Sequence, residues 1–140
     1  MAIPDHLTLE IVTPDRSIAH GEVDEVVVPG AEGSFGVLPG HTPLLSTLTV
    51  GEIEYRRGDE RTYVAVSFGF AEVLPDRVTI LAQIAEASEE IDVTRAEAAV
   101  KRARERLARP AVELDYERAR LSLLKSLVRL QVATRRGHRS

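Results

Sequence analysis

Short segments in which apolar and polar residues alternate fill the first part of the chain and predict β-strands. Residues 7–11 alternate with a period of two, which is typical of a strand with one buried face. Three consecutive valines within residues 23–28 favour a strand covered on both faces. Further strand-like segments are residues 17–20, 44–48, 51–57, 63–66, 68–74 and 78–82. We therefore expect residues 1–86 to form a β-sandwich, that is, a flattened antiparallel β-barrel.

Glycine and proline gather between two of these segments, in residues 30–48. Glycine adopts positive φ without steric cost, and proline fixes φ and lacks a backbone donor. The stretch therefore predicts a corner at which the sheet folds onto its partner. It lacks the Gly-Lys-Ser/Thr of a phosphate loop and no helix follows it, so we do not expect nucleotide to bind there.

The hydrophobic period changes after an acidic connector at residues 85–90, where we expect a hinge. Residues 93–109 and about 115–135 predict two helices in an antiparallel hairpin, within a C-terminal region of residues 87–140. The apolar residues of the first helix span about 120° of its circumference, enough for a single partner. Those of the second span about 200°, so this helix should contact more than its neighbour in the hairpin.

Charge divides the chain in the same place. Residues 1–91 hold 16 acidic and 5 basic residues, whereas residues 92–140 hold 6 and 13, which gives net charges of −11 and +7. On a helical projection the cations fall on one side of each helix, and closing the hairpin can bring seven of them together: Arg95, Arg102, Arg106, Arg109, Arg118, Lys125 and Arg129. The residues alone are compatible with three interpretations of this cationic surface: a solvated helix face, an anion site, or a nucleic-acid-binding surface.

Other classes of function have little support in the sequence. Without cysteine, a disulfide framework or a thiolate metal site is impossible. No local pattern suggests a catalytic nucleophile or a metal site, so we expect a non-catalytic protein. There is no signal-peptide pattern at the N-terminus and no apolar run near the ~20 residues of a membrane span. We expect an intracellular protein that reaches a membrane only through a partner.

Residues 23–45, VDEVVVPGAEGSFGVLPGHTPLL, resemble the epsilon subunits of the rotary F-type ATP synthase of bacteria and plastids, and the likeness extends from about residue 7 to about residue 133. The resemblance implies a central-stalk role in which the β-domain holds the gamma subunit and the membrane-embedded c-ring together. It also implies that the hairpin inhibits ATP hydrolysis when it extends along gamma and meets the beta subunits. The expected location is the cytoplasmic face of the bacterial cell membrane, as a peripheral part of the complex.

The segment IDVTRA, residues 91–96, is similar to the motif with which some bacterial epsilon subunits bind ATP. Carried over by position, this implies nucleotide contacts at Glu86, Ile91, Asp92, Arg95, Ala96, Arg102, Lys125 and Arg129. Lys125 departs from the arginine of the ATP-binding members and lacks its bidentate fork. No cofactor is required by the resemblance, and ATP would act only as a regulatory ligand.

The residues expected to bind partners come from the glycine-rich loop and from the hairpin. They are Glu32, Ser34, Phe35, His41, Arg106, Arg109, Arg118, Leu121, Leu124 and Val128. Ser34 stands where the family often has an acidic residue. The rival hypothesis is a nucleic-acid-binding module that uses the basic hairpin, although it leaves the acidic β-domain and the leucines without a purpose.

Overall fold

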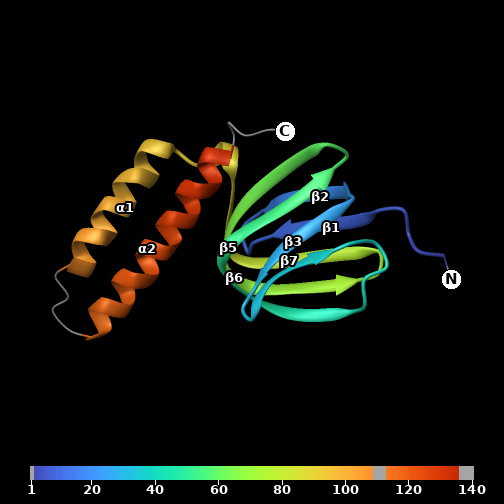
Figure 1. Ribbon diagram of the computed structural model, residues 1–140, viewed down its shortest axis with the longest axis horizontal. Helices are drawn as coiled ribbons and strands as arrows, with labels where there is room; N and C mark the ends of the chain where they lie inside the picture. Colours follow the sequence, from blue (N-terminus) through green and yellow to red (C-terminus); the bar gives the residue numbers. More distant parts are fainter. Residues whose placement is uncertain (1, 109–112, 136–140) are drawn as a thin grey trace.

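A computed structural model describes residues 2–108 and 113–135, and it consists of a β-domain followed by a helical hairpin (Figure 1). The strands are β1 (Leu7–Val12), β2 (Ser17–Val23), β3 (Glu25–Gly30), β4 (Gly33–Val37), β5 (Leu44–Arg57), β6 (Glu60–Leu74) and β7 (Arg77–Ala87). A 3-10 turn, η1 (Ser88–Glu90), leads to α1 (Val93–Ala108) and α2 (Glu113–Thr134). The predicted fold class is confirmed.

The strands described by the structure form a single sheet that curls around one core. Their order is β2-β1-β7-β6-β5-β3-β4, and within this described sheet every pairing is antiparallel except the parallel pairing of β1 with β7. All seven strands contribute side chains to the main core, including Leu9, Val26, Ile53, Val64 and Ile80. Because the curled sheet encloses one continuous apolar core, the β-domain folds as one unit.

Three long strands change which of their faces points inward at one shared row of the sheet. In β6 the residues that enter the main core are Val64 and Val66 before the change, and Ala71 and Val73 after it. At the change Phe68 has a φ of 59° and Gly69 a φ of 130°, both in the left-handed region. The sequence suggested breaks here between separate short strands. The structure instead bends continuous strands, which lets the sheet close around its core.

The glycine-rich stretch is not the corner that we expected. Gly30 pairs with Gly33 across a two-residue turn, so β3 and β4 form a tight hairpin within the same sheet. The chain then loops through residues 38–43 before β5 begins. That prediction was wrong because glycine content marks sharp turns without saying whether the turn reverses a strand or folds a sheet. The main bend of the sheet lies at residues 68–69.

The hairpin packs against the β-domain mainly through the C-terminal part of α2, and α1 lies on the outer side of α2 (Figure 1). A second hydrophobic cluster joins the two parts: Ala65 from β6, Ile91 from the connector, Ala96 from α1, and Val132 and Ala133 from α2. Three of these five residues are alanines, so the fully buried side chains are small, and the partly buried Tyr63, Val93, Val128 and Leu130 pack around them. The acidic connector is shorter than expected, because β7 continues to Ala87 and η1 follows at once.

Replacing Gly69 by alanine tests the bend. A Cβ at this position would lie 2.0 Å from the carbonyl oxygen of Leu81, in addition to the unfavourable positive φ. We expect Gly69→Ala to lower the free energy of unfolding by about 3–5 kcal/mol, measured by urea denaturation. Gly33→Ala is the matched control, because Gly33 has a φ of 134° with no atom within 4 Å of the added Cβ. Gly33→Ala should lower the free energy of unfolding by only about 1–2 kcal/mol. If both variants lowered it equally, the bend would not require a glycine for steric reasons.

Candidate functional site

Two glutamates flank an alanine on the face of the sheet that receives α2. Glu52 of β5 pairs in register with Ala65 of β6, and Ala65 pairs with Glu86 of β7. Neighbouring strands lie about 4.8 Å apart, so the backbones of the two glutamates are about 10 Å apart. The small Ala65 is buried between them. This Glu52–Ala65–Glu86 row therefore leaves room for a helix between two carboxylates.

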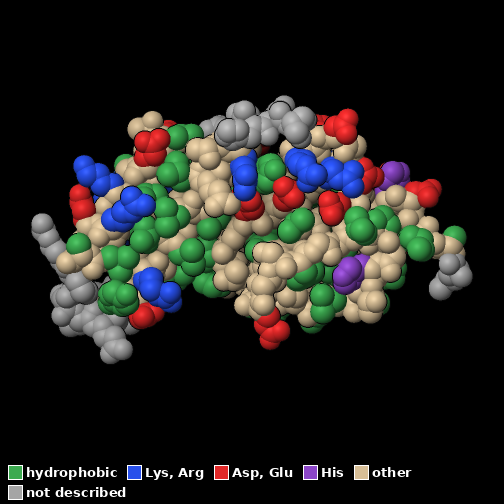
Figure 2. All heavy atoms as spheres, in the orientation of Figure 1, with side chains coloured by type: hydrophobic (Ala, Val, Ile, Leu, Met, Phe, Trp, Pro, Cys, Tyr) green, Lys and Arg blue, Asp and Glu red, His purple; other side chains and the backbone are tan. Residues whose placement is uncertain are grey.

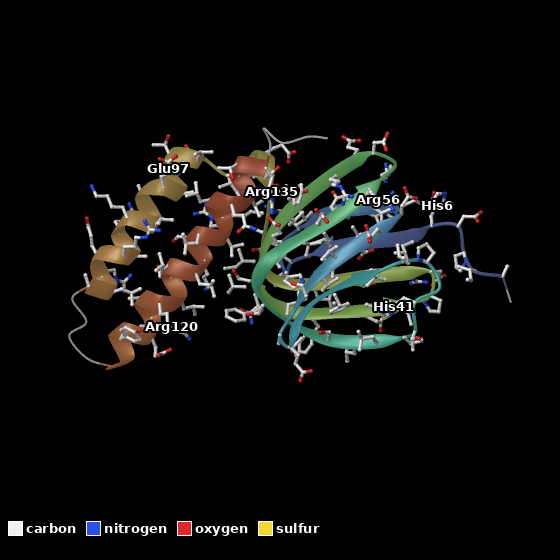
Figure 3. All side chains as sticks on the ribbon, viewed as in Figure 1. His6, His41, Arg56, Glu97, Arg120 and Arg135 are labelled. Atoms are coloured by element: carbon white, nitrogen blue, oxygen red, sulfur yellow. The ribbon has the colours of Figure 1, made fainter. Side chains whose placement is uncertain are left out.

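α2 places an arginine on each of these carboxylates. Arg129 donates from Nε and Nη2 to Glu86, at 2.7 and 3.2 Å, and Arg135, just after the helix, donates from Nη2 and Nε to Glu52, at 2.7 and 3.3 Å. The two arginines lie about 120° apart around a helical projection, so they reach opposite sides of the row. Figure 3 shows Arg135 beside the β-domain and Arg120 toward the other end of α2. The hairpin is held by two bidentate, charge-assisted pairs.

The Glu52–Arg135 pair has a further support in Tyr63. The guanidinium of Arg135 lies 4.8 Å from the centre of the Tyr63 ring, where a cation–π contact is favourable. The Glu52 side chain is 16% exposed, so water screens this pair only partly. Its hydrogen bond to Glu52 raises the pKa of Arg135 above the ordinary range. Partial burial raises the pKa of Tyr63, and the carboxylate of Glu54 raises it further.

The connector between the β-domain and α1 is fixed in a similar way. Arg16, in the turn after β1, binds both carboxylate oxygens of Glu90 at 2.9 and 2.5 Å and donates to the carbonyl of Ala85 at 3.3 Å. The hydrogen bond to Glu90 raises the pKa of Arg16. Ser88 and Ile91 are buried on either side of Glu90. The segment expected to be a hinge is therefore attached to the β-domain as far as Ile91.

The residues implied in ATP binding lie around this junction, and the structure brings some of them into contact. Glu86 and Arg129 are bonded to each other, and Ile91 and Ala96 are buried in the second cluster. Asp92 caps α1 by accepting a hydrogen bond from the Arg95 backbone N–H at 3.1 Å. The remaining members are the exposed side chains of Arg95 and Arg102, and Lys125, whose Nζ lies 5.6 Å from the centre of the Phe68 ring.

The predicted basic surface is divided between two environments. Arg95, Arg102, Arg106 and Arg118 are exposed on the helices, whereas Arg129 and Lys125 contact the β-domain. Arg109 lies outside the described residues. The space-filling view has blue cationic side chains over the hairpin (Figure 2). The described cations of this set therefore do not gather around a single anion.

The other predicted partner-binding residues are distributed over two regions. Glu32 and Ser34 are exposed at the β3–β4 hairpin, where a hollow of about 460 Å³ is lined in part by both, whereas Phe35 is half-buried against the main core. His41 Nδ1 lies 2.7 Å from the carbonyl oxygen of Thr42. On α2, Leu121 and Leu124 are exposed. Val128, by contrast, packs against the second cluster.

Sequence reasoning missed an apolar patch on the outer face of the sheet. Phe70 and Leu81 are cross-strand neighbours, and each is about half exposed. Beside them lies a hollow of about 350 Å³, whose lining includes Val12 and Pro14. We call this surface the Phe70–Leu81 patch. The sequence did contain a signal for this patch. Ile80, Leu81 and Ala82 are consecutive and apolar, and they cannot all point inward because side chains alternate between the two faces of a strand.

The part of the chain that the structure describes contains neither a cluster of side chains that could bind a metal nor a helix that could span a membrane. No three His, Asp or Glu side chains gather there in a way that could hold a metal ion. Neither described helix is long and apolar enough to cross a bilayer.

Comparison with known families accounts for both parts of the structure. The family described as ATP synthase, Delta/Epsilon chain, beta-sandwich domain matches residues 6–88, and the long alpha-helix domain of the same chain type matches residues 89–134. The chain belongs to the ATP synthase epsilon-chain family. It is thus a subunit of the complex that makes ATP, and the nucleic-acid-binding alternative finds no support in the comparisons.

Epsilon chains of bacteria are similar over nearly the whole length. The ATP synthase epsilon chain of Syntrophobacter fumaroxidans is 52% identical over 129 residues, which cover 92% of this chain and 96% of that one. Epsilon chain 2 of Syntrophotalea carbinolica is 49% identical over 133 residues, covering 94% and 96%. Among solved structures, a chain of the Euglena gracilis mitochondrial ATP synthase, resolved with OSCP, F1 and the c-ring, matches with a TM-score of 0.83 at 26% identity, covering 96% of this chain and 84% of that one.

Proposed function

We propose that this epsilon subunit is a non-catalytic part of the central stalk that joins the gamma subunit to the c-ring and restrains ATP hydrolysis through its hairpin. The observation that carries the proposal is how the hairpin is attached. The fully buried part of its contact with the β-domain is rich in alanine, whereas Leu121, Leu124 and Leu127 of α2 remain exposed. A helix with unused apolar surface and a modest attachment is suited to a second docking position.

The β-domain offers two distinct surfaces for the rotor. The Phe70–Leu81 patch suits a protein partner that covers apolar side chains, and we assign gamma to it. The exposed β3–β4 hairpin, with Glu32 and Ser34, is assigned to the c-ring. Through these contacts the protein would lie at the cytoplasmic face of the bacterial cell membrane without entering the bilayer.

The hairpin would have two positions. In one it lies on the Glu52–Ala65–Glu86 row, as in this structure. In the other it extends along gamma, where its leucines become covered and its exposed arginines approach an acidic segment of the beta subunits. The extended position would block rotation in the direction of hydrolysis. A ligand can change the balance only if it prefers one position over the other.

ATP is a candidate for such a ligand. Arg95 and Arg102 on α1, with Lys125 and Arg129 on α2, supply donors suited to phosphate oxygens. Asp92, Ile91 and Ala96 would position the N-terminus of α1 beside them. Since Arg129 is bonded to Glu86 here, bound ATP would have to share or replace that pair.

The assignment of gamma to the patch predicts an assembly defect. Leu81→Asp places a carboxylate in a surface that gamma would cover, while the exposed position leaves folding nearly unchanged. We expect at least a tenfold loss of epsilon recovered with the detergent-solubilised complex, measured by co-purification. Tyr116→Asp makes a comparable change at an exposed residue of α2 outside the expected partner contacts and should assemble normally. Normal recovery of the Leu81 variant would argue against the patch.

Removing the hairpin tests its inhibitory role. Deletion of residues 88–140 should leave the rotor contacts of the β-domain in place and increase ATP hydrolysis by the assembled complex several-fold. Steady-state hydrolysis per complex is the measurement, after equal epsilon content has been verified. Deletion of residues 136–140 alone, which removes no part of α2, is the control. An unchanged rate in the larger deletion would rule out inhibition by this hairpin.

Calorimetry of the full-length chain with ATP tests nucleotide binding. We expect saturable heat from the wild type, and at least a tenfold weaker affinity for Arg129→Ala, because a charge-assisted contact to phosphate is lost. Arg104→Ala removes an equivalent charge from a position of α1 that the resemblance does not implicate, and should bind like the wild type. The ATP proposal fails if both variants give the same isotherm as the wild type.

A further inference from the structure

Two arginine–glutamate pairs hold α2, and they differ in whether ATP would compete for their side chains. Arg129 and Glu86 belong to the set implied in ATP contact, so a nucleotide would compete with their bond. Glu52 and Arg135 lie outside that set. Their bond joins residues 83 positions apart in sequence and connects β5 to the end of α2.

Several contacts make the Glu52–Arg135 pair stronger than an ordinary surface pair. Both guanidinium–carboxylate hydrogen bonds are present, the side chains of Glu52 and Arg135 are 16% and 37% exposed, and the guanidinium lies 4.8 Å from the centre of the Tyr63 ring. Exposed single pairs contribute little, but partly buried bidentate pairs with additional contacts contribute more. The fully buried side chains of the cluster beside the pair are mostly alanines, so the polar contact adds substantially to the attachment.

The position of the pair also matters. Arg135 follows the last turn of α2, next to Val132 and Ala133 in the second cluster. The connector is attached separately through Arg16 and Glu90. When the hairpin leaves the β-domain, the Arg135 contact must therefore break, whatever happens at the connector.

We propose that Glu52 and Arg135 form a latch that sets how often the hairpin leaves the β-domain, and that this latch acts independently of the Glu86–Arg129 pair. The proposal rests on the proposed two-position function of the hairpin. It adds a contact whose strength does not depend on ATP, so that hairpin release has a nucleotide-independent component. Salt would weaken the latch by screening its charges.

Amide hydrogen exchange of residues 128–134 in the full-length chain measures the latch directly. We expect Glu52→Gln and Arg135→Gln each to raise the opening equilibrium about tenfold, and the double variant to add little more, because both changes remove the same interaction. Raising ionic strength from about 0.05 to about 0.5 M should increase exchange in the wild type more than in Glu52→Gln. Slow exchange at core positions such as Leu9 and Ile80 would verify that the β-domain stays folded.

Two further variants make the result specific. Glu25→Gln removes an ion-pair partner of Arg56 within the β-domain and should leave exchange in α2 unchanged. Reversing the pair, with Glu52→Arg and Arg135→Glu together, should restore slower exchange than either reversal alone. The latch is overturned if exchange in Glu52→Gln equals that of the wild type, or if the effects of the single substitutions simply add.

Hydrolysis by the assembled complex separates the latch from the proposed function. Weakening the latch should favour the extended hairpin, so Glu52→Gln should lower hydrolysis, opposite to deletion of the hairpin. Faster exchange with unchanged hydrolysis would keep the latch and refute inhibition. Unchanged exchange would refute the latch, whatever the rate of hydrolysis.

Discussion

The bend at Phe68 and Gly69 is the constraint on which the rest of the molecule depends. It reverses the inward and outward faces of β6, and its neighbours β5 and β7 reverse with it. Without that reversal the continued alternation would turn Glu52 and Glu86 toward the core, where an unpaired charge is very costly. With it, Ile53 and Val64 point inward, and the glutamates face α2. The same local geometry thus closes the core and creates the docking surface.

The docking surface combines a small apolar contact with directional charge pairs. Alanines at positions 65, 96 and 133 let the elements approach closely but contribute little transfer free energy. The arginine pairs then fix where α2 lies, since a bidentate fork tolerates little misalignment. Such an attachment is specific without being strong. These are the properties that a reversible position of the hairpin requires.

Sequence patterns predicted the elements better than their spatial relations. The apolar stripe of α1 is correct, because Ala96, Val100 and Ala103 are the residues buried on that helix. The wide apolar arc of α2 also agrees with the exposed leucines. Long strands were divided at their bend, since a change in alternation looks the same as a gap between strands. The glycine-rich stretch was misread for the related reason that turn residues do not reveal which strands they connect.

The candidate site could be predicted only where a motif or a resemblance named its residues. Glu86 and Arg129 were selected in this way, but their direct bond was not anticipated. Glu52 and Arg135 carry no local signal, because their meeting depends on the register of β5 with β6 and on the placement of α2. Strand register over long sequence separations is set by core packing, and a single sequence does not display it. The run from Ile80 to Ala82 did signal an outward apolar residue, but the pairing of Leu81 with Phe70 that makes the patch again depends on strand register.

The Arg16–Glu90 contact has a mechanical consequence for α1. With the connector attached as far as Ile91, the proposed movement of the hairpin would have its pivot at Asp92, at the very start of the helix. The 16 residues of α1 make a rigid lever about 24 Å long. A turn of only about 10° at its base would displace its tip by about 4 Å, close to the spacing of neighbouring strands. In the proposed movement, a change in one or two backbone torsions at Asp92 would thus shift the far end of α1 by about the spacing of two strands.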